Sequence, residues 1–84
     1  MLARLFNYLD YGSRPDRAIV RLGSYGQGCE YRGWFLERVF DDGREVHAIR
    51  LRGVISARQA VAVVGRIWPG VPVAVGRPDI FGHL

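Results

Sequence analysis

Apolar residues along the chain follow two kinds of spacing. Near the amino terminus they recur at helical spacing and predict a short helix over residues 1–9, with one apolar stripe made of Leu2, Leu5, Phe6 and Leu9. From Ala18 to Leu22 apolar residues alternate along the chain, which predicts a strand. Two more strands are expected, one from about Cys29 to Phe40 and one from Glu45 to Val54. Three glycines in the segment 23–28 separate the first strand from the second.

The connection between the second and third strands contains Asp42-Gly43, a strong signal for a two-residue hairpin turn. With that turn, the apolar side chains of both strands gather on one face: Trp34 opposite Leu51, and Leu36 opposite Ile49. Arg38 is then expected beside His47, and the other face of the sheet is mixed. A three-residue turn would place Trp34 against Arg50 and remove this segregation, so the two-residue turn is predicted.

The segment 56–68 carries the clearest helix signal. Ser56 and Gln59 have the spacing of a capping box, in which the serine oxygen accepts a hydrogen bond from a free amide and the glutamine reaches back. One helical face is apolar and consists of Ala57, Ala60, Val61, Val64, Ile67 and Trp68. Pro69-Gly70 ends the predicted helix.

Val71–Val75 is predicted to form a fourth strand. Pro72 cannot donate a hydrogen bond to a ladder, so this strand belongs at a sheet edge. The segment 76–84 is expected to be irregular and held in place by Ile80 and Phe81. These elements predict a single α+β domain over residues 1–84. It is a two-layer sandwich with a short amino-terminal helix, a three-stranded antiparallel meander, one helix over the Trp34 face, and a carboxy-terminal edge strand.

Composition is typical of a globular chain, with 49% hydrophobic and 24% charged residues. The net charge of +4 favours acidic partners, either nucleic acid or an acidic protein face. A modest net charge also keeps a small protein soluble, so both interpretations stay open. No apolar run approaches the roughly 18 residues of a membrane span. The amino terminus has no apolar stretch of the signal-peptide kind. A cytoplasmic location without a membrane partner is therefore expected.

All twelve basic residues are arginine. The guanidinium group binds carboxylates and phosphates with two donors at once and stacks on aromatic rings, which suits a binding surface. A GC-rich genome would also replace lysine with arginine, because lysine codons are AT-rich. Cys29 is the only cysteine, which excludes an internal disulfide, and it is expected to be a small buried residue.

Residues with catalytic potential are few. His47 lies within a predicted strand, His83 is the penultimate residue, and the three serines occupy turns or caps. Asp41 and Asp42 are adjacent, but a hairpin turn accounts for both. No nucleophile stands at a definite spacing from a base, and no metal-ligand spacing is present. We therefore expect a protein that is not an enzyme and that uses no cofactor or metal.

The mixed face of the sheet is the candidate binding surface. With the glycine segment 23–28 it gathers arginines and aromatic rings: Arg21, Tyr25, Tyr31, Phe35, Glu37, Arg50 and Arg52. Such a set is typical of a protein interface, and it also suits base stacking and phosphate contacts in nucleic acids. A solvated face with ordinary cross-strand pairs is the third interpretation. The glycine segment does not predict a phosphate cradle, because a strand and not a helix follows it.

Two resemblances add to this picture. The order helix–strand–strand–strand–helix over about residues 1–68 resembles the double-stranded-RNA-binding domain. That family opens its second helix with lysines, where the stretch 53–61 offers only Arg58. As a compact chain without catalytic residues, the protein also resembles the small phage-borne inhibitors, above all anti-CRISPR proteins, which share no motif. This resemblance implies a stoichiometric inhibitor that blocks a partner protein or nucleoprotein complex. A nucleic-acid-binding module is the alternative, and a homodimer through the 71–75 edge strand is a third.

Overall fold

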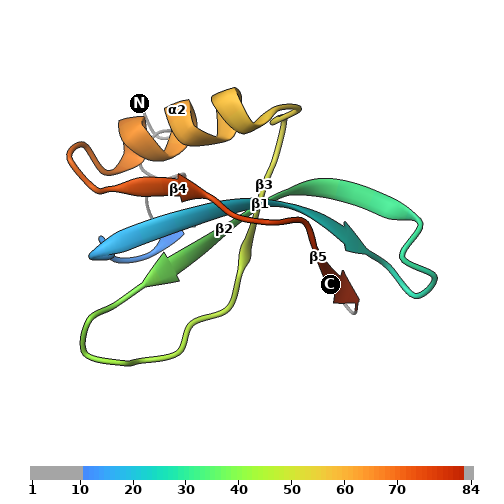
Figure 1. Cartoon of the computed structure of the whole chain (residues 1–84), viewed down its shortest axis with the longest axis horizontal. Coiled ribbons are helices and arrows are strands. Elements are labelled where there is room, and N and C mark those ends of the chain that lie inside the picture. Colours follow the sequence, from blue (N-terminus) through green and yellow to red (C-terminus); the bar gives the residue numbers. More distant parts are fainter. Residues whose placement is uncertain (1–10, 83–84) are drawn as a thin grey trace.

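The computed structural model describes residues 11–82, so the helix predicted over residues 1–9 lies outside the described part of the chain. The described elements follow one another as β1 (Arg17–Tyr25), β2 (Tyr31–Val39), β3 (Ile49–Leu51), α2 (Ala57–Ile67), β4 (Val73–Val75) and β5 (Asp79–Gly82). The helix α2 lies across one face of a mixed sheet (Figure 1). The predicted α+β class and its helix-on-sheet layers are therefore confirmed.

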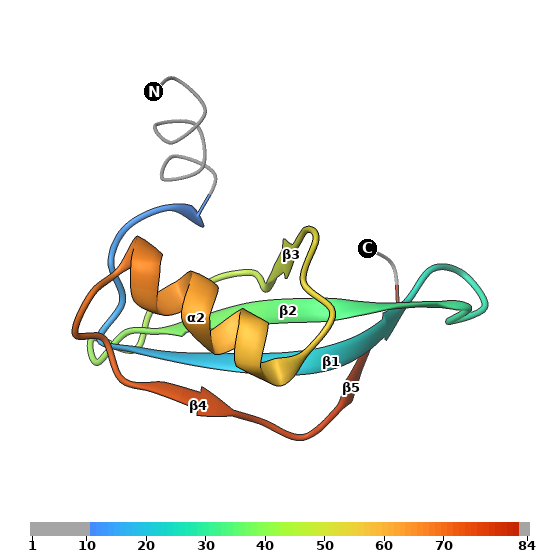
Figure 2. The same cartoon turned by 90° about the horizontal axis from the view of Figure 1, so that it is seen from above.

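The sheet has five strands and not the predicted three-stranded meander with one edge strand. Its order is β3-β2-β1-β4. The strand β5 lies on the same edge of β1 as β4 and pairs with a later part of β1. β1 pairs with β2 in antiparallel orientation over its whole length, from Arg17 opposite Val39 to Tyr25 opposite Tyr31. On its other edge β1 pairs in parallel first with β4 and then with β5. The chain bends between these two short strands (Figure 2).

The predicted register of β2 and β3 is confirmed, although the predicted turn is wrong. Trp34 lies opposite Leu51, and the two neighbouring pairs also match the prediction. The backbone N–H of Gly43 donates to the carbonyl of Phe40 at 3.1 Å, so Asp41 and Asp42 are the central residues of the turn. Gly43 has a φ of 79°, a conformation that glycine adopts without steric cost. Register therefore follows from the burial of the apolar face and does not depend on the turn type.

The third strand is much shorter than the predicted segment from Glu45 to Val54. Only Ile49–Leu51 is a strand, and residues 43–48 form no regular element. The expected pair of Arg38 with His47 is therefore not part of the ladder. From the turn-flanking pair Phe40 and Gly43, Leu36 lies four residues back and its partner Ile49 six residues on. A turn placed one residue earlier than predicted therefore leaves two additional residues in the return segment, so a continuous hairpin cannot form.

The helix α2 begins as its sequence predicts. Ser56 is the N-cap, and its Oγ accepts a hydrogen bond from the backbone N–H of Gln59 at 3.2 Å. The Oε1 atom of Gln59 accepts a hydrogen bond from the backbone N–H of Ile55 at 2.9 Å. The amides of Gln59 and Ile55, which have no partner within the helix, are therefore both hydrogen-bonded. Trp68 is the C-cap, and Gly70, with a φ of 86°, lies in the turn that follows.

The main core lies between α2 and the sheet. Its buried residues come from β1, β2, β3, α2 and the segment between α2 and β4, and Val73 of β4 packs against them: Ala18, Val20, Leu36, Leu51, Ala60, Val64, Trp68 and Val71. Trp34 is half-buried and packs against this cluster, whereas Ile49 is half-buried and does not belong to it. The predicted edge position of the fourth strand is confirmed, because β4 pairs only with β1. The carbonyl of Pro72 accepts a hydrogen bond from Ala18 at 2.9 Å, which needs no donor from the proline.

A second, smaller packing unit covers the opposite face of the sheet. The strand β5 places Phe81 on Phe35, with ring centroids 4.1 Å apart and planes inclined by 22°. Phe35 is fully buried as a result. A Cβ atom at Gly23 would lie 2.4 Å from the Phe81 ring and 2.6 Å from the Phe35 ring, so any larger residue would displace these rings. The segment 76–84 is therefore not wholly irregular as predicted, and Ile80 is exposed whereas Phe81 is packed.

Candidate functional site

Three side chains from three strands meet on the face of the sheet that α2 leaves uncovered. They are Tyr25 of β1, Tyr31 of β2 and Arg50 of β3, here called the tyrosine–arginine cluster. The Nη1 atom of Arg50 donates to the Tyr25 hydroxyl at 2.6 Å, and the guanidinium carbon lies 5.2 Å from the centroid of the same ring. The rings of Tyr25 and Tyr31 are 5.4 Å apart. Arg50 is thus held by a hydrogen bond and a cation–π contact.

The cluster rests on the stacked pair Phe35 and Phe81, of which Phe35 is fully buried and Phe81 half-buried. Tyr25 contacts Phe35 edge to face, with centroids 5.7 Å apart and planes inclined by 77°. Gly33 lies next to the cluster, and a Cβ atom there would be 3.5 Å from Tyr25 and 3.7 Å from Arg50. Two side chains therefore lie over bare backbone at this point. The result is a surface fixed from below by packed aromatic rings.

Part of the tyrosine–arginine cluster faces solvent. Tyr31 is 55% exposed, Arg50 is exposed, and Tyr25 is half-buried. An accessible phenol ring and an ordered guanidinium together offer stacking, hydrogen-bond donation and positive charge. Tyrosine and arginine in such a setting are the residue types that contribute most to binding at protein interfaces.

Arg21 and Glu37, two other predicted site residues, are paired with each other. The Arg21 guanidinium forms an ion pair with the Glu37 carboxylate and also donates to the carbonyl of Arg77 at 3.2 Å. Gly76 allows this approach, because a Cβ atom there would lie 2.5 Å from the Arg21 side chain. Both charges are engaged within the chain, which leaves them a structural role between β1, β2 and the segment before β5.

Phe35 lies opposite Arg50 as the register predicts but is buried, and Arg52 lies outside the predicted strand. Phe35 is 0% exposed, since Phe81 covers it, so it supports the surface from beneath. Arg52 follows the end of β3 in a turn and lines a groove beside α2, away from the tyrosine–arginine cluster. Alternation along a strand cannot be extended past Leu51, where the strand ends.

The predicted glycine loop is shorter than the segment 23–28. β1 continues to Tyr25, so this tyrosine belongs to the sheet and does not stand at the tip of a loop. The connection between β1 and β2 consists of residues 26–30. Cys29 in this connection is exposed and has a φ of 54°, which contradicts the expected buried position.

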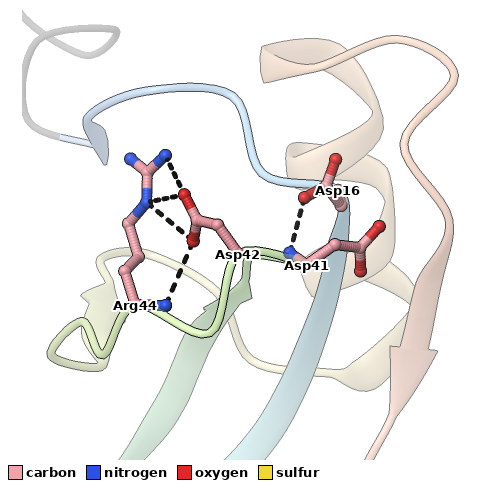
Figure 3. Close-up of polar contacts among 4 residues, drawn as sticks. All are labelled: Asp16, Asp41, Asp42 and Arg44. Atoms are coloured by element: carbon pink, nitrogen blue, oxygen red, sulfur yellow. Dashed lines mark hydrogen bonds and ion pairs between the residues drawn. The ribbon is translucent and has the colours of Figure 1, made fainter.

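The turn after β2 is held by contacts of the Asp41 backbone and of the Asp42 carboxylate (Figure 3). Asp16 Oδ2 accepts from the backbone N–H of Asp41 at 2.7 Å, which ties the turn to the segment before β1. Asp42 Oδ2 accepts from the Arg44 guanidinium at 2.6 Å, and Asp42 Oδ1 accepts from the Arg44 backbone N–H at 3.1 Å. The Arg44 guanidinium carbon also lies 4.3 Å from the Phe40 ring centroid. The adjacent aspartates therefore shape a turn, as the sequence predicts.

These contacts change the acidity of both partners in the turn. The side-chain hydrogen bond from Arg44 lowers the pKa of Asp42 below its ordinary value of 3.8. The same hydrogen bond raises the pKa of Arg44. Within residues 11–82, no three His, Cys, Asp or Glu side chains are grouped so that they could hold a metal ion.

Comparison of the chain with protein-family models, with curated proteins and with solved structures gave no match. In the described range, helices are all too short or too polar to cross a membrane. What the chain does must therefore be argued from the surfaces of this fold alone.

Sequence reasoning missed Phe81 as part of the candidate site. The signal lies in two glycines, because Gly23 and Gly33 are opposite each other in the register of β1 and β2. Facing glycines on a strand pair leave room for large rings to lie flat on the sheet. Phe81, in the apolar pair Ile80-Phe81 near the end of the chain, provides such a ring.

Proposed function

We propose that the protein acts by binding and not by turnover, and that the tyrosine–arginine cluster docks on a partner protein. The observation that carries this proposal is that the side chains of the cluster are exposed to solvent and yet held in place by contacts within the protein. Tyr31 and Arg50 face solvent, whereas the ring of Tyr25 that holds them rests on buried Phe35. A binding surface that is ordered before contact loses less conformational entropy on association.

The kind of binding protein that we propose is a small cytoplasmic inhibitor of the phage or mobile-element type, similar in kind to anti-CRISPR proteins. Its partner would be a protein or a nucleoprotein complex, blocked in a stoichiometric complex. Support comes from the small size of the chain and from a binding surface built of tyrosine and arginine. The positive net charge of +4 favours an acidic face on the partner.

Nucleic-acid binding is the second candidate function, and a specific observation favours it. Seven exposed arginines have guanidinium groups that make no hydrogen bond or ion pair with residues 11–82: Arg14, Arg17, Arg32, Arg52, Arg58, Arg66 and Arg77. Guanidinium groups without an internal partner are available to phosphates. This candidate predicts an affinity that falls steeply with salt, whereas an aromatic-centred protein interface is less sensitive to salt.

A pull-down from lysate of cells that naturally produce the chain tests the first proposal. Tagged protein is used with and without nuclease, and the captured proteins are identified by mass spectrometry. A partner retained after nuclease supports protein docking. Loss of all captured material after nuclease contradicts it and supports the nucleic-acid candidate.

Two substitutions on neighbouring strands make this experiment specific. Arg50→Ala removes the exposed charge of the cluster, and Arg32→Ala removes an exposed arginine of β2 whose side chain alternates onto the other face. Both variants lose the same charge. Docking through the cluster requires that Arg50→Ala weakens capture and Arg32→Ala does not. Equal loss in both variants would show that net charge, and not the cluster, drives the interaction.

A further inference from the structure

A groove lies between the turn that follows β3 and the helix α2. Its volume is about 330 Å³, within the lower range of ligand-binding clefts. The lining residues come from the turn after β3 and from α2, which follows it directly in the chain: Arg52, Gly53, Val54, Gln59, Ala62, Val63 and Arg66. The groove is on the helix side of the sheet, so it is separate from the tyrosine–arginine cluster.

The lining combines aliphatic side chains with hydrogen-bond donors. Val54 and Val63 are half-buried and pack against the main core, which fixes their positions. Among the polar side chains, Arg52 and Arg66 make no hydrogen bond or ion pair with residues 11–82. The Oε1 atom of Gln59 is already occupied by the Ile55 amide, so its NH₂ group is what remains. The polar side-chain groups left available are therefore all donors.

Charge is distributed unevenly along the sequence around this groove. The stretch of residues 46–78 contains five arginines and no aspartate or glutamate: Arg50, Arg52, Arg58, Arg66 and Arg77. All eight acidic residues lie outside this stretch. The first turn of α2 also lacks an acidic residue. No carboxylate from the same stretch is therefore present to neutralise Arg52 and Arg66.

We infer that this groove binds an acidic peptide segment of a partner protein, with one aliphatic side chain between carboxylates. The aliphatic side chain would contact Val54, Ala62 and Val63, and the carboxylates would pair with the guanidinium groups of Arg52 and Arg66. Guanidinium groups bind carboxylates with two parallel hydrogen bonds. A phosphate backbone would satisfy the arginines as well, but it has no aliphatic group for the apolar lining. The combination of both features selects the peptide.

The test uses a short blocked peptide, Glu-Glu-Leu-Glu-Glu, titrated into the full chain and followed by NMR of the backbone amides. Saturable shifts are expected at Val54, Ala62 and Val63, with the amides of Tyr25 and Tyr31 unchanged. Replacement of the peptide leucine by serine should weaken binding about tenfold through loss of apolar burial. Replacement of the glutamates by glutamine should weaken it by at least about tenfold.

Variants of the protein supply the matched comparison. Arg52→Gln and Arg66→Gln should each weaken peptide binding about tenfold, because each removes a charge-assisted pair. Arg58→Gln removes the same charge from an exposed position of α2 that does not line the groove, so affinity should be unchanged. The amide spectrum of each variant reports whether it is folded. The mapping of shifts in the unsubstituted chain needs no variant at all.

Several results would overturn the inference. They are the absence of saturable shifts, shifts confined to the tyrosine–arginine cluster, or an equal effect of Arg58→Gln. Binding of an oligothymidylate that shifts the same amides and depends on the same two arginines would assign the groove to nucleic acid instead. The variant Arg50→Ala separates this site from the proposed docking surface, since it should leave peptide binding intact. Either proposal can therefore fail without the other.

Discussion

Phe81 of β5 stacks on Phe35 of β2, and this contact closes the face of the sheet opposite α2. The two residues are far apart in the sequence and are joined across β1, which pairs with both strands. Because Phe35 is fully buried by the contact, a residue that alternation assigns to an exposed face becomes part of a second core. The tyrosine–arginine cluster is built on this pair.

Phe81→Ala should destabilise the fold by about 2 kcal/mol, less than the loss of a fully buried phenylalanine, because Phe81 itself is half-buried. Urea unfolding followed by fluorescence of Trp34 and Trp68 measures the effect. Ile80→Ala is the matched control on the same strand, since Ile80 is 68% exposed and should change stability by less than about 0.5 kcal/mol. Similar losses in the two variants would contradict a packing role for Phe81.

Gly23→Ala should destabilise the chain by about 1–3 kcal/mol, because the new methyl group overlaps the rings of Phe35 and Phe81. Gly33→Ala is the control at the paired position, where the methyl group meets only ordinary contacts at 3.5 Å. A double-mutant cycle identifies the cause. In a Phe81→Ala background the cost of Gly23→Ala should fall, and an unchanged cost would mean that the overlap with Phe81 is not the reason.

Asp42→Asn should remove a pH-dependent part of the stability. The folded-state pKa of Asp42 is lowered by the Arg44 hydrogen bond, so the stabilising effect of this pair is fully present above the unfolded pKa of 3.8. It is lost as the pH falls through the lowered pKa. Thermal midpoints of the variant and the unsubstituted chain should therefore differ near neutral pH and converge as the pH falls below about 4.

Asp41→Asn is the control for this measurement. It removes the same charge from a side chain that makes no hydrogen bond within the described range. Its difference from the unsubstituted chain should show less convergence at low pH. Parallel curves for both variants would mean that the Asp42–Arg44 pair contributes nothing specific.

Ser56→Ala should lower the stability by about 1 kcal/mol, because the Gln59 amide loses its acceptor at the start of α2. Ser13→Ala changes an exposed serine outside the helices and strands of the described fold and should have almost no effect. Circular dichroism during thermal unfolding compares the two variants. Coincident midpoints would exclude a capping contribution from Ser56.

The sequence predicted those parts of the fold in which a repeated apolar spacing meets a buried face. The α2 cap, the packed helix face and the register of Trp34 with Leu51 all have this basis. The turn between β2 and β3 was placed one residue too late, because Asp-Gly suits both a two-residue loop and a turn that ends at Gly43. Burial fixed the register without the predicted turn.

The spacing of apolar residues could not predict the strand β5 or the second core. A strand of four residues that pairs in parallel with a distant one has too few positions for a period to be visible. The face of the sheet on which Arg52 lies also depends on where β3 ends, and no local sequence pattern specifies that position. Of the predicted site, Tyr25, Tyr31 and Arg50 come together on the surface, with Phe35 buried beneath them. Arg21 pairs with Glu37, and Arg52 lines the groove beside α2. The sequence therefore identified the face correctly but not the role of each residue on it.

One edge of β1 is shared between two short strands, β4 and β5, and this division has a consequence for local stability. Of these two strands, only β4 packs against the main core under α2, whereas β5 packs on the opposite face of the sheet through Phe81. Release of β5 from β1 would bare the Phe35 ring while the helix and the other strands kept their packing. Such a partial opening, confined to the aromatic face, would cost less free energy than global unfolding, because the main core stays packed.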